Sequence, residues 1–336
     1  MSATDETLQI GGQSMVLRDV TPADQADVLA LHQQVFGTPV DAAWFDWKYR
    51  LGGGEGVGLW HQGQMIAHCG GVPRNIWHAN QLEHNLQIGD VMVAPEWRGI
   101  LTRRGPFFQV SKRFYDTRLG ERQRFHAGFG FPSARHLQLA MKVGLLWPSG
   151  VMTGLHWRAQ TPDKVLSRWR WQTSRLLPDS PTFDAAINIV WKQMRAQANG
   201  LLIGERDATY VRWRYVQRPA LEHTFLQLRR PWQSAPLGIA VLGPVSAGQP
   251  VQWLDWLGPP AFLPQACTLC QTEAQRLGAA GMTAWASQAV LQVLSATGID
   301  SQAEVAHIGM PTTSALAPEA AAQLNWWFMG GDTDFL

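Results

Sequence analysis

Three arginines follow an apolar strand within a short stretch of this 336-residue chain. The strand is predicted at residues 91–94, and Pro95, an Arg-Gly pair and a predicted helix come after it. A strand-to-helix turn directs unpaired backbone N–H groups outward, and the helix dipole adds partial positive charge. Glycine gives the backbone freedom for a close approach. This stretch therefore predicts an anion site at the turn, with Gly99 and the arginines Arg98, Arg103 and Arg104.

The charge of the surrounding segment fits a discrete anionic ligand better than a nucleic acid. Residues 95–124 hold eight Arg or Lys against three Asp or Glu, a local charge of +5, whereas the whole chain carries +2. A nucleic-acid groove needs basic residues spread along a face, and the rest of this chain is net acidic. We expect no nucleic-acid partner.

Three side chains near this strand are candidates for proton transfer. Asp90 directly precedes the strand, His68 lies on the preceding predicted hairpin, and His126 begins the next strand. A carboxylate or a neutral imidazole within hydrogen-bond reach can act as a general base. Structural roles remain open for each: Asp90 can cap a turn or pair with an arginine, His68 can be a satisfied core residue, and His126 can lie at a strand end.

A repeat in the sequence indicates the elements that position these groups. Asp41–Tyr49 aligns with Asp207–Tyr215 at an offset of 166 residues, with four of the nine positions identical. After each copy come two predicted strands as a hairpin, a third strand, a helix, a short strand and a helix that ends at glycine. We expect Trp47 and Trp213 to be core anchors of the two copies.

The sequence therefore predicts an α/β (α+β) fold with two tandem lobes, each a mixed, mostly antiparallel sheet flanked by helices. The first lobe adds a leading strand and a helix whose start is marked by Thr-Pro-Ala-Asp at residues 21–24. We place the N-terminal lobe at residues 1–155, a linker at 156–185 and the C-terminal lobe at 186–336. Residues 164–177 look amphipathic, and we expect a bridging helix there.

The corresponding turn of the second lobe has a different composition. Residues 257–264 contain three prolines and no basic residue. Because proline has no backbone N–H, this turn lacks donors where a phosphate needs them. We expect that the second lobe binds no pyrophosphate and instead shapes the acceptor pocket or stabilises the first lobe.

The strand, x-Pro-x-x-Arg-Gly and helix pattern resembles motif A of the GNAT (GCN5-related N-acetyltransferase) superfamily, and FGFPSARHLQLAMKVGLLWP resembles its second signature. The resemblance implies tandem GNAT-like lobes with acetyl-CoA, or another acyl-CoA, as cosubstrate. It implies that backbone amides grip the pyrophosphate. The cofactor-binding residues would be Val91, Met92, Val93 and the seven residues from Arg98 to Arg104.

The chain departs from the family pattern at two places. Leu101 and Arg103 stand where the family turn has small residues, so the loop must open differently around a phosphate. Ala140 stands four residues before Gly144, where many members have a tyrosine that acts as general acid. The departing thiolate must then be protonated by another group or by water.

These features predict an acyl-CoA-dependent N-acyltransferase that transfers acetyl, or a longer acyl group, to a small-molecule or peptide amine. The thioester carbonyl would be held by a backbone N–H of the strand at residues 91–93. Two alternatives remain, an acyl-CoA-binding or structural protein without turnover and an aminoacyl-tRNA-dependent peptidyltransferase with tandem lobes. The sequence does not indicate the acceptor, the acyl length or the oligomeric state.

The cysteines, the hydropathy and the two ends of the sequence lead to further predictions about metal binding, membrane spans and location. Cys267 and Cys270 have no second Cys or His pair at zinc spacing, so we expect buried helix residues and no metal. No apolar run approaches the roughly 20 residues that span a bilayer. The polar N-terminus resembles no targeting peptide, and we expect a cytoplasmic location. The C-terminal residues either close over the site, with Asp332 or Asp334 near the amine, or form a packed tail.

Overall fold

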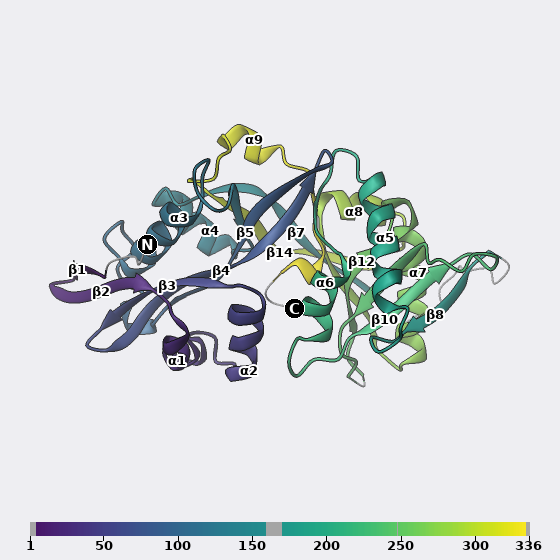
Figure 1. The fold of residues 1–336 in the computed structure, drawn as a ribbon, viewed down its shortest axis with the longest axis horizontal. Coiled ribbons are helices and arrows are strands. Elements are labelled where there is room, and N and C mark those ends of the chain that lie inside the picture. The colour runs from purple at the N-terminus through teal and green to yellow at the C-terminus, as the bar shows by residue number, and fades with distance from the viewer. Residues whose placement is uncertain (1–4, 159–169, 247, 334–336) are drawn as a thin grey trace. The chain divides into compact units, whose positions relative to one another are not determined.

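The computed structural model describes residues 5–158, 170–246 and 248–333. These residues form two compact units, and each unit combines segments that lie far apart in the sequence (Figure 1). Unit 1 contains the described residues up to Arg74, together with His84–Ser149 and His307–Gln323. Unit 2 contains Asn75–Glu83, the described residues of 150–306, and those that follow Gln323.

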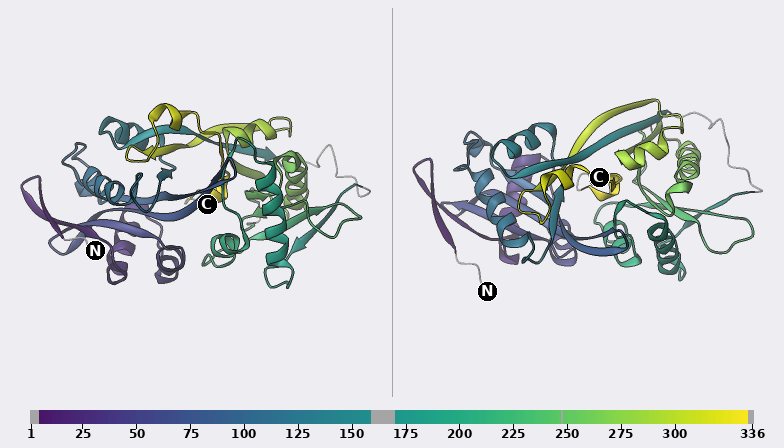
Figure 2. Two further views of the ribbon diagram at one scale, coloured as in Figure 1. Left: turned by 45° about the horizontal axis from the view of Figure 1, so that its top comes forward. Right: turned by 90° about the horizontal axis from the view of Figure 1, so that it is seen from above.

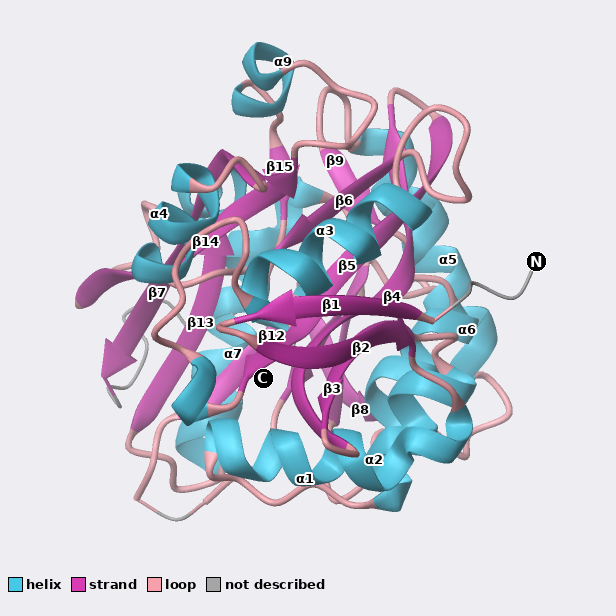
Figure 3. Cartoon of the chain, turned by 90° about the vertical axis from the view of Figure 1, so that its left-hand side faces the viewer, coloured by secondary structure: helices cyan, strands magenta, loops and turns pink. Residues whose placement is uncertain are grey.

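Unit 1 is built on a sheet with the strand order β1-β2-β3-β4-β5-β6-β14. Its strands are β1 (Glu6–Ile10), β2 (Gln13–Asp19), β3 (Glu55–His61), β4 (Gln64–His78), β5 (Gln81–Val93), β6 (Ala127–Gly130) and the end of β14 (Ser301–Pro311). β1 and β2 pair as an antiparallel hairpin at one edge (Figure 3). Its helical segments are η1 (Pro22–Asp24), α1 (Gln25–Phe36), α2 (Ala42–Phe45), the π-helix η2 (Asp46–Leu51), η3 (Pro95–Trp97), α3 (Pro106–Arg118), α4 (Ala134–Lys142) and α9 (Pro318–Ala322).

Helices cover both faces of this sheet, with α1 and α2 on one face and α3 on the other (Figures 1 and 2). Neighbouring residues of β4 confirm this division, because successive side chains of a strand point to opposite faces. Cys69 lies close to Ser111 and Tyr115 of α3, whose side chains lower the pKa of its thiol against the larger rise that burial causes. His68 instead faces Tyr49 of η2, with ring centroids 6.1 Å apart. Side chains that lie on the same face of the sheet as His68 are therefore separated from α3 by the sheet itself.

Unit 2 has the strand order β7-β13-β12-β11-β10-β8. Its strands are β7 (Leu146–Arg158), β8 (Gln172–Leu176), β9 (Leu202–Gly204), β10 (Thr224–Arg229), β11 (Gly238–Leu242), β12 (Val251–Leu257), β13 (Gly281–Ser287) and β15 (Trp326–Trp327). Its helical segments are α5 (Phe183–Gln197), α6 (Ala208–Val211), the π-helix η4 (Arg212–Val216), η5 (Pro260–Phe262), α7 (Leu263–Arg276), α8 (Gln288–Leu294) and η6 (Gly330–Asp332).

Side chains alternate cleanly between the two faces of the unit 2 sheet. Along β11, Ile239 and Val241 join the core under α5 and α6, whereas Ala240 and Leu242 join the core under α7 and α8. This alternation is the pattern of a strand with apolar layers on both sides. None of the helices in the described part of the chain is long and apolar enough to cross a membrane.

The two halves of the sequence exchange their last strands. Residues 152–158 of β7 follow the first repeat, yet they pair with β13 in unit 2. β14 follows the second repeat, yet Gly309 pairs with Gly130 of β6 in unit 1. Ser314 Oγ accepts from Gly128 N at 3.2 Å and further fixes the segment after β14. The units therefore do not follow the boundaries predicted at residues 155 and 186.

The region predicted as a linker is also different. Residues 172–176 form β8 and pair with β10 from Gln172↔Arg229 to Leu176↔Phe225. The edge of β10 offers unpaired backbone groups, and this segment satisfies them as a strand instead of forming the predicted helix. The remaining residues of that predicted helix, 164–169, lie outside the described residues.

The predicted repeat appears as the same local structure in both units. Asp41 accepts from Trp44 N and caps α2, and Asp207 accepts from Tyr210 N and caps α6. A π-helix follows directly in each unit. Trp47 is buried, as expected, whereas Trp213 is only partly buried. Two lobes with mixed, mostly antiparallel sheets flanked by helices confirm the predicted fold class.

Candidate functional site

Strands β5 and β6 of unit 1 diverge before β5 ends. They run parallel and pair from Asn85↔Ala127 to Ile88↔Gly130, and β5 then continues to Val93. Asp90 interrupts the extended backbone with φ 50°, in the left-handed region that residues other than glycine adopt rarely. Such an irregularity redirects a strand. Pairing with β6 ends at Ile88, two residues before Asp90, so the last residues of β5 run on without a partner in β6.

The loop between β5 and α3 is basic and anchored at both ends. It runs from Arg98 to Gly105, between the 3-10 turn η3 and the start of α3. Arg98 Nε donates to Val93 O at 2.9 Å, and Arg103 Nε donates to Val143 O at 3.1 Å. Each guanidinium carries five N–H donors, so these anchors leave donors for a ligand. Both arginine side chains are exposed.

The other predicted cofactor residues lie on the same loop and strand. Met92 is buried, whereas Ile100 is partly buried and packs against the core. Leu101, which departs from the family pattern, has 52% of its surface exposed and takes up no space inside the loop core. Thr102 Oγ1 accepts from Arg104 N at 3.2 Å, which helps to shape the turn. The remaining predicted residues are Val91 and Val93, which are partly buried, and Gly99, which is exposed.

The start of α3 gives the loop a residue that the sequence prediction missed. The predicted anion site ends at Arg104, whereas α3 begins at Pro106 with Gly105 as N-cap. A Cβ on Gly105 would lie 1.9 Å from Ile100 O, so the loop closes only around glycine here. Gly-Pro at the N-cap and first helical position is a signal that marks this start in the sequence.

Asp90 lies at the centre of a buried polar cluster on the α1 and α2 face. Lys48 Nζ donates to Asp90 Oδ1 at 2.9 Å, and Tyr49 OH donates to Asp90 Oδ2 at 2.6 Å. The Lys48 and Asp90 side chains are each only 7% exposed. Burial raises the pKa of Asp90, but the Lys48 charge and the two hydrogen bonds lower it more, so the net pKa falls below its usual range. Asp90 is a bound carboxylate and not a free base.

The side chain of His68 contacts the same cluster through the backbone carbonyl of Asp90. Its Nδ1 lies 2.8 Å from Asp90 O. Because a carbonyl oxygen only accepts, Nδ1 carries the proton and Nε2 keeps a lone pair. Burial lowers the pKa of His68, so the imidazole is neutral. No partner for Nε2 exists among the described residues.

Two glycines make room for this ring. A Cβ on Gly56 would lie 2.5 Å from His68 Nε2, and a Cβ on Gly70 would lie 2.7 Å from His68 Cε1 and 2.8 Å from Tyr49 OH. Any side chain at these positions would displace the imidazole. Lys48, Tyr49 and the two glycines were not among the predicted site residues, although Lys48 and Tyr49 belong to the repeat that the sequence showed.

His126 does not join this cluster. Its N donates to His84 O, which places it level with His84 along β5. Asp90 lies six residues further along that strand, or about 20 Å at the usual rise of a strand. The structure therefore brings together Asp90 and His68 but not His126.

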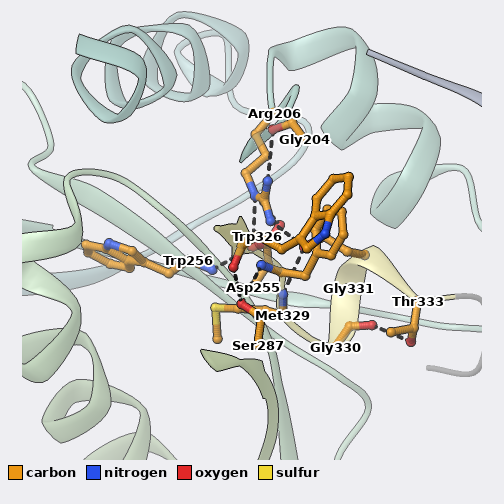
Figure 4. A network of polar contacts seen from close by, with 12 residues as sticks. Gly204, Arg206, Asp255, Trp256, Ser287, Trp326, Met329, Gly330, Gly331 and Thr333 are labelled. Carbon is orange, nitrogen blue, oxygen red and sulfur yellow. Dashed lines mark hydrogen bonds and ion pairs between the residues drawn. The ribbon is translucent and has the colours of Figure 1, made fainter. Parts of the chain in front are cut away.

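Unit 2 contains a related but closed polar cluster (Figure 4). Tyr215 OH donates to Asp255 Oδ2 at 2.9 Å, as Tyr49 does to Asp90. Arg206 Nε lies 3.0 Å from Asp255 Oδ1, and Arg206 Nη2 lies 2.6 Å from Asp332 Oδ2. Asp332 is thus buried in an ion pair and is not available to an amine, which corrects one of the two expectations for the C-terminal residues. Asp334 lies outside the described residues.

The CxxC of the sequence lies in the core of unit 2. Cys267 and Cys270 lie one turn apart on α7, and both are buried free thiols. Burial raises the pKa of Cys267 to about 12 and that of Cys270 well above its ordinary value. Neither forms a reactive thiolate near neutral pH, so the predicted role as buried helix residues is confirmed.

Comparison with known proteins shows what this arrangement is similar to. Residues 16–135 match the family model described as an acetyltransferase (GNAT) domain. A probable N-acyltransferase from Enterococcus faecalis V583 has a similar fold with a TM-score of 0.65 and 12% identity, covering 88% of this chain and 71% of that one. A GCN5-related N-acetyltransferase from Kribbella flavida has a TM-score of 0.61 and 16% identity, covering 91% and 71%.

A third solved structure extends the similarity of fold along most of the chain. Saccharomyces cerevisiae N-myristoyltransferase with bound myristoyl-CoA has a TM-score of 0.56 and 10% identity, covering 96% of this chain and 89% of that one. The sequence matches none of the curated proteins with which it was compared. Residues 16–135 are therefore similar to a GNAT domain, and the described chain has a two-lobed, GNAT-like fold.

Proposed function

We propose that unit 1 is an acyl-CoA-dependent N-acyltransferase that acts on a small-molecule or peptide amine. The observation that carries this proposal is the divergence of β5 from β6 just before Asp90, followed by a basic loop and the N-terminus of α3. A thioester lying along the end of β5 and a pyrophosphate at the loop fit this order of groups. The GNAT domain match supports the same assignment.

The pyrophosphate would bind at the loop and the first turn of α3. Pro106 has no N–H, but Phe107 and Phe108 lie in the first turn, where backbone donors have no intrahelical partner. Arg103 and Arg104 are exposed beside this turn and can make charge-assisted bonds to phosphate. The helix dipole favours the same anion.

The reaction would be a direct transfer. The amine nitrogen attacks the thioester carbonyl, whose developing negative charge is stabilised by a backbone N–H at the end of β5. Collapse of the tetrahedral intermediate forms the amide and expels the CoA thiolate. Ala140 is fully buried and supplies no acid. A thiol has an ordinary pKa of about 8.5, so the thiolate can leave and take its proton from water.

The amine must also lose a proton, and we assign that proton to His68, which is fully buried and would receive it through a water molecule rather than by direct contact with the amine. The ring is neutral, Nδ1 is committed to Asp90 O, and Nε2 retains the lone pair that a general base needs. Asp90 acts as a positioning residue, because its carboxylate is occupied by Lys48 and Tyr49. His126 has no part in this assignment.

Thermal denaturation with acetyl-CoA and longer acyl-CoAs tests the binding step. A ligand at a hundred times its dissociation constant adds about 2.7 kcal/mol to the stability of the folded protein. Arg103→Ala should remove the shift, whereas Pro259→Ala in unit 2 should not. No shift with any CoA would sink the proposal.

Thiol release in the presence of a panel of amines tests turnover. His68→Gln should lower kcat at least tenfold and remove the acid limb of the pH profile, which a general base produces as it becomes protonated. His223→Gln is the matched control, because His223 is a partly buried unit 2 histidine whose Nδ1 contacts a backbone carbonyl, Tyr215 O. Binding without acceptor-dependent thiol release would instead support the non-catalytic acyl-CoA-binding alternative.

A further inference from the structure

Strands β12 and β13 of unit 2 diverge as β5 and β6 do in unit 1. They run parallel and pair from Val251↔Met282 to Trp253↔Ala284. β12 then continues to Leu257 and β13 to Ser287. In both units, the pairing of two parallel strands therefore stops two residues before an aspartate, Asp90 in unit 1 and Asp255 in unit 2.

A segment near the C-terminus, Trp326–Thr333, pairs with the freed end of β13 (Figure 4). Ser287 N donates to Phe328 O at 2.9 Å, and Ser287 Oγ donates to Trp326 O at 2.5 Å. Phe328 N donates back to Ser287 Oγ at 3.0 Å. Met329 forms an antiparallel bridge with Ala286. This segment thus satisfies backbone groups that the separation of β13 from β12 would leave unpaired.

The same segment packs against β12 on its other side. A Cβ on Gly331 would lie 3.1 Å from Leu254 O and 2.0 Å from Tyr215 OH, so the backbone of Gly331 fills the space between them. Asp332 is 1% exposed and its carboxylate is paired with Arg206, which also holds Asp255 of β12. Moving the segment away would leave Arg206 Nη2, in a fully buried guanidinium, without its 2.6 Å bond to Asp332 Oδ2.

We propose that Trp326–Thr333 permanently occupies, in unit 2, the divergence that corresponds to the acyl-CoA site of unit 1. The segment is a covalently attached occupant that makes strand-like hydrogen bonds and contributes a buried anion, as a bound ligand would. The chain therefore has one acyl-CoA site, and the closure of unit 2 does not depend on its Pro-rich turn alone. The correspondence to an acyl-CoA site rests on the proposed function, whereas the occupancy of unit 2 does not.

Hydrogen exchange on the full-length protein tests the occupancy. Amides of residues 326–333 should be as protected as those of β12 and β13, and acetyl-CoA should leave their exchange unchanged while slowing exchange in residues 94–108. Calorimetric titration with acetyl-CoA should give one site per chain. A second site, or faster exchange of residues 326–333 with acetyl-CoA, would overturn the proposal. If no CoA binds at all, the proposed function fails, but the protection of this segment still decides its occupancy.

A rescue experiment tests the geometry. Gly331→Ala should speed exchange of residues 326–333 at least tenfold, because its Cβ collides with Tyr215 OH. Adding Tyr215→Phe removes that hydroxyl and should return exchange to within about threefold of Tyr215→Phe alone. Gly243→Ala is the control, because the nearest atom to its Cβ is 3.5 Å away. Normal protection in Gly331→Ala would show that the segment does not lie in this position.

Discussion

The two units use the same strand-to-helix connection and differ in what is inserted into it. In unit 1, Ala94 has φ −56° and ψ 140° before the 3-10 turn η3, and in unit 2, Pro259 has φ −53° and ψ 136° before η5. α7 follows η5 directly, whereas the loop Arg98–Gly105 separates η3 from α3. The basic loop is thus an addition to a turn that both units share, and among the described residues only unit 1 has it.

The buried polar clusters around Asp90 and Asp255 can be compared in the same way. Both keep a tyrosine that donates to an aspartate on the central strand, so this pair belongs to the architecture and not to catalysis alone. β11, the unit 2 counterpart of His68's strand, carries only glycine and apolar residues. His68 and the basic loop are therefore the features that separate a candidate catalytic unit from a closed one.

The largest loss of stability is expected from removing the buried cation of each polar cluster, Lys48 in unit 1 and Arg206 in unit 2. Arg206→Met leaves Asp255 and Asp332 together without a counter-charge and should cost about 3–5 kcal/mol in chemical denaturation. Lys48→Met leaves Asp90 with its hydrogen bond from Tyr49 and should cost about 1–3 kcal/mol. An equal or smaller loss for Arg206→Met would mean that the unit 2 centre is not the more tightly closed one.

A smaller effect is expected at the loop that unit 2 lacks. Gly105→Ala forces a Cβ against Ile100 O and should cost about 2–3 kcal/mol, and it should also abolish the acetyl-CoA-dependent rise in melting temperature. The Cβ of Gly99→Ala meets nothing within 4 Å, so its stability should change by less than about 0.5 kcal/mol. If Gly105→Ala still gains stability from acetyl-CoA, the loop is not the pyrophosphate site.

Acid should weaken unit 2 through a histidine. Burial lowers the pKa of His223 to about 4, whereas an unfolded histidine has a pKa near 6.5. The folded state binds this proton less tightly, so the stabilisation is present above pH 6.5 and is lost as pH falls from 6.5 towards 4. Because the side chain is partly solvated, we expect about 2 kcal/mol. Denaturation from pH 7 to 4 should show a shallower loss in His223→Gln, and an unchanged slope would contradict the assignment.

The smallest loss of stability is expected from the tyrosine of each polar cluster, and it distinguishes the two units most clearly. Tyr49→Phe and Tyr215→Phe each remove one hydrogen bond to a buried carboxylate and should each cost about 1–2 kcal/mol. Only Tyr49→Phe should also lower kcat, by roughly threefold to tenfold, with little change in KM for acetyl-CoA. Equal kcat losses for the two variants would show that the tyrosines act only through global stability.

The sequence predicts the parts of this fold that depend on local patterns. The repeat at Asp41–Tyr49 and Asp207–Tyr215 predicts two similar lobes, and the basic stretch after β5 predicts the loop. The end of that loop is predicted less accurately, because α3 begins only after Gly105. The repeat also directs attention to Trp47, whereas the neighbouring Lys48 and Tyr49 make the contacts to Asp90.

Contacts between distant segments are the part that a single sequence does not predict. The bond from His68 Nδ1 to Asp90 O joins residues 22 positions apart and depends on the left-handed backbone of Asp90. The pairing of Gly309 with Gly130 joins residues in different repeats. Local hydrophobic periodicity is the same whichever sheet a strand joins, so the strand exchange leaves no signal in it.

The exchange of last strands has a consequence for the synthesis of the chain on the ribosome. Domains usually fold in the order in which they emerge, N-terminal first. Here the sheet of unit 1 is completed by His307–Gln323, which is translated after almost all of unit 2. Until then the free edge of β6 is exposed to wrong pairing. A premature stop codon near residue 300 should therefore abolish not only the closed unit but also the proposed acyl-CoA site, although all the residues of that site precede the stop.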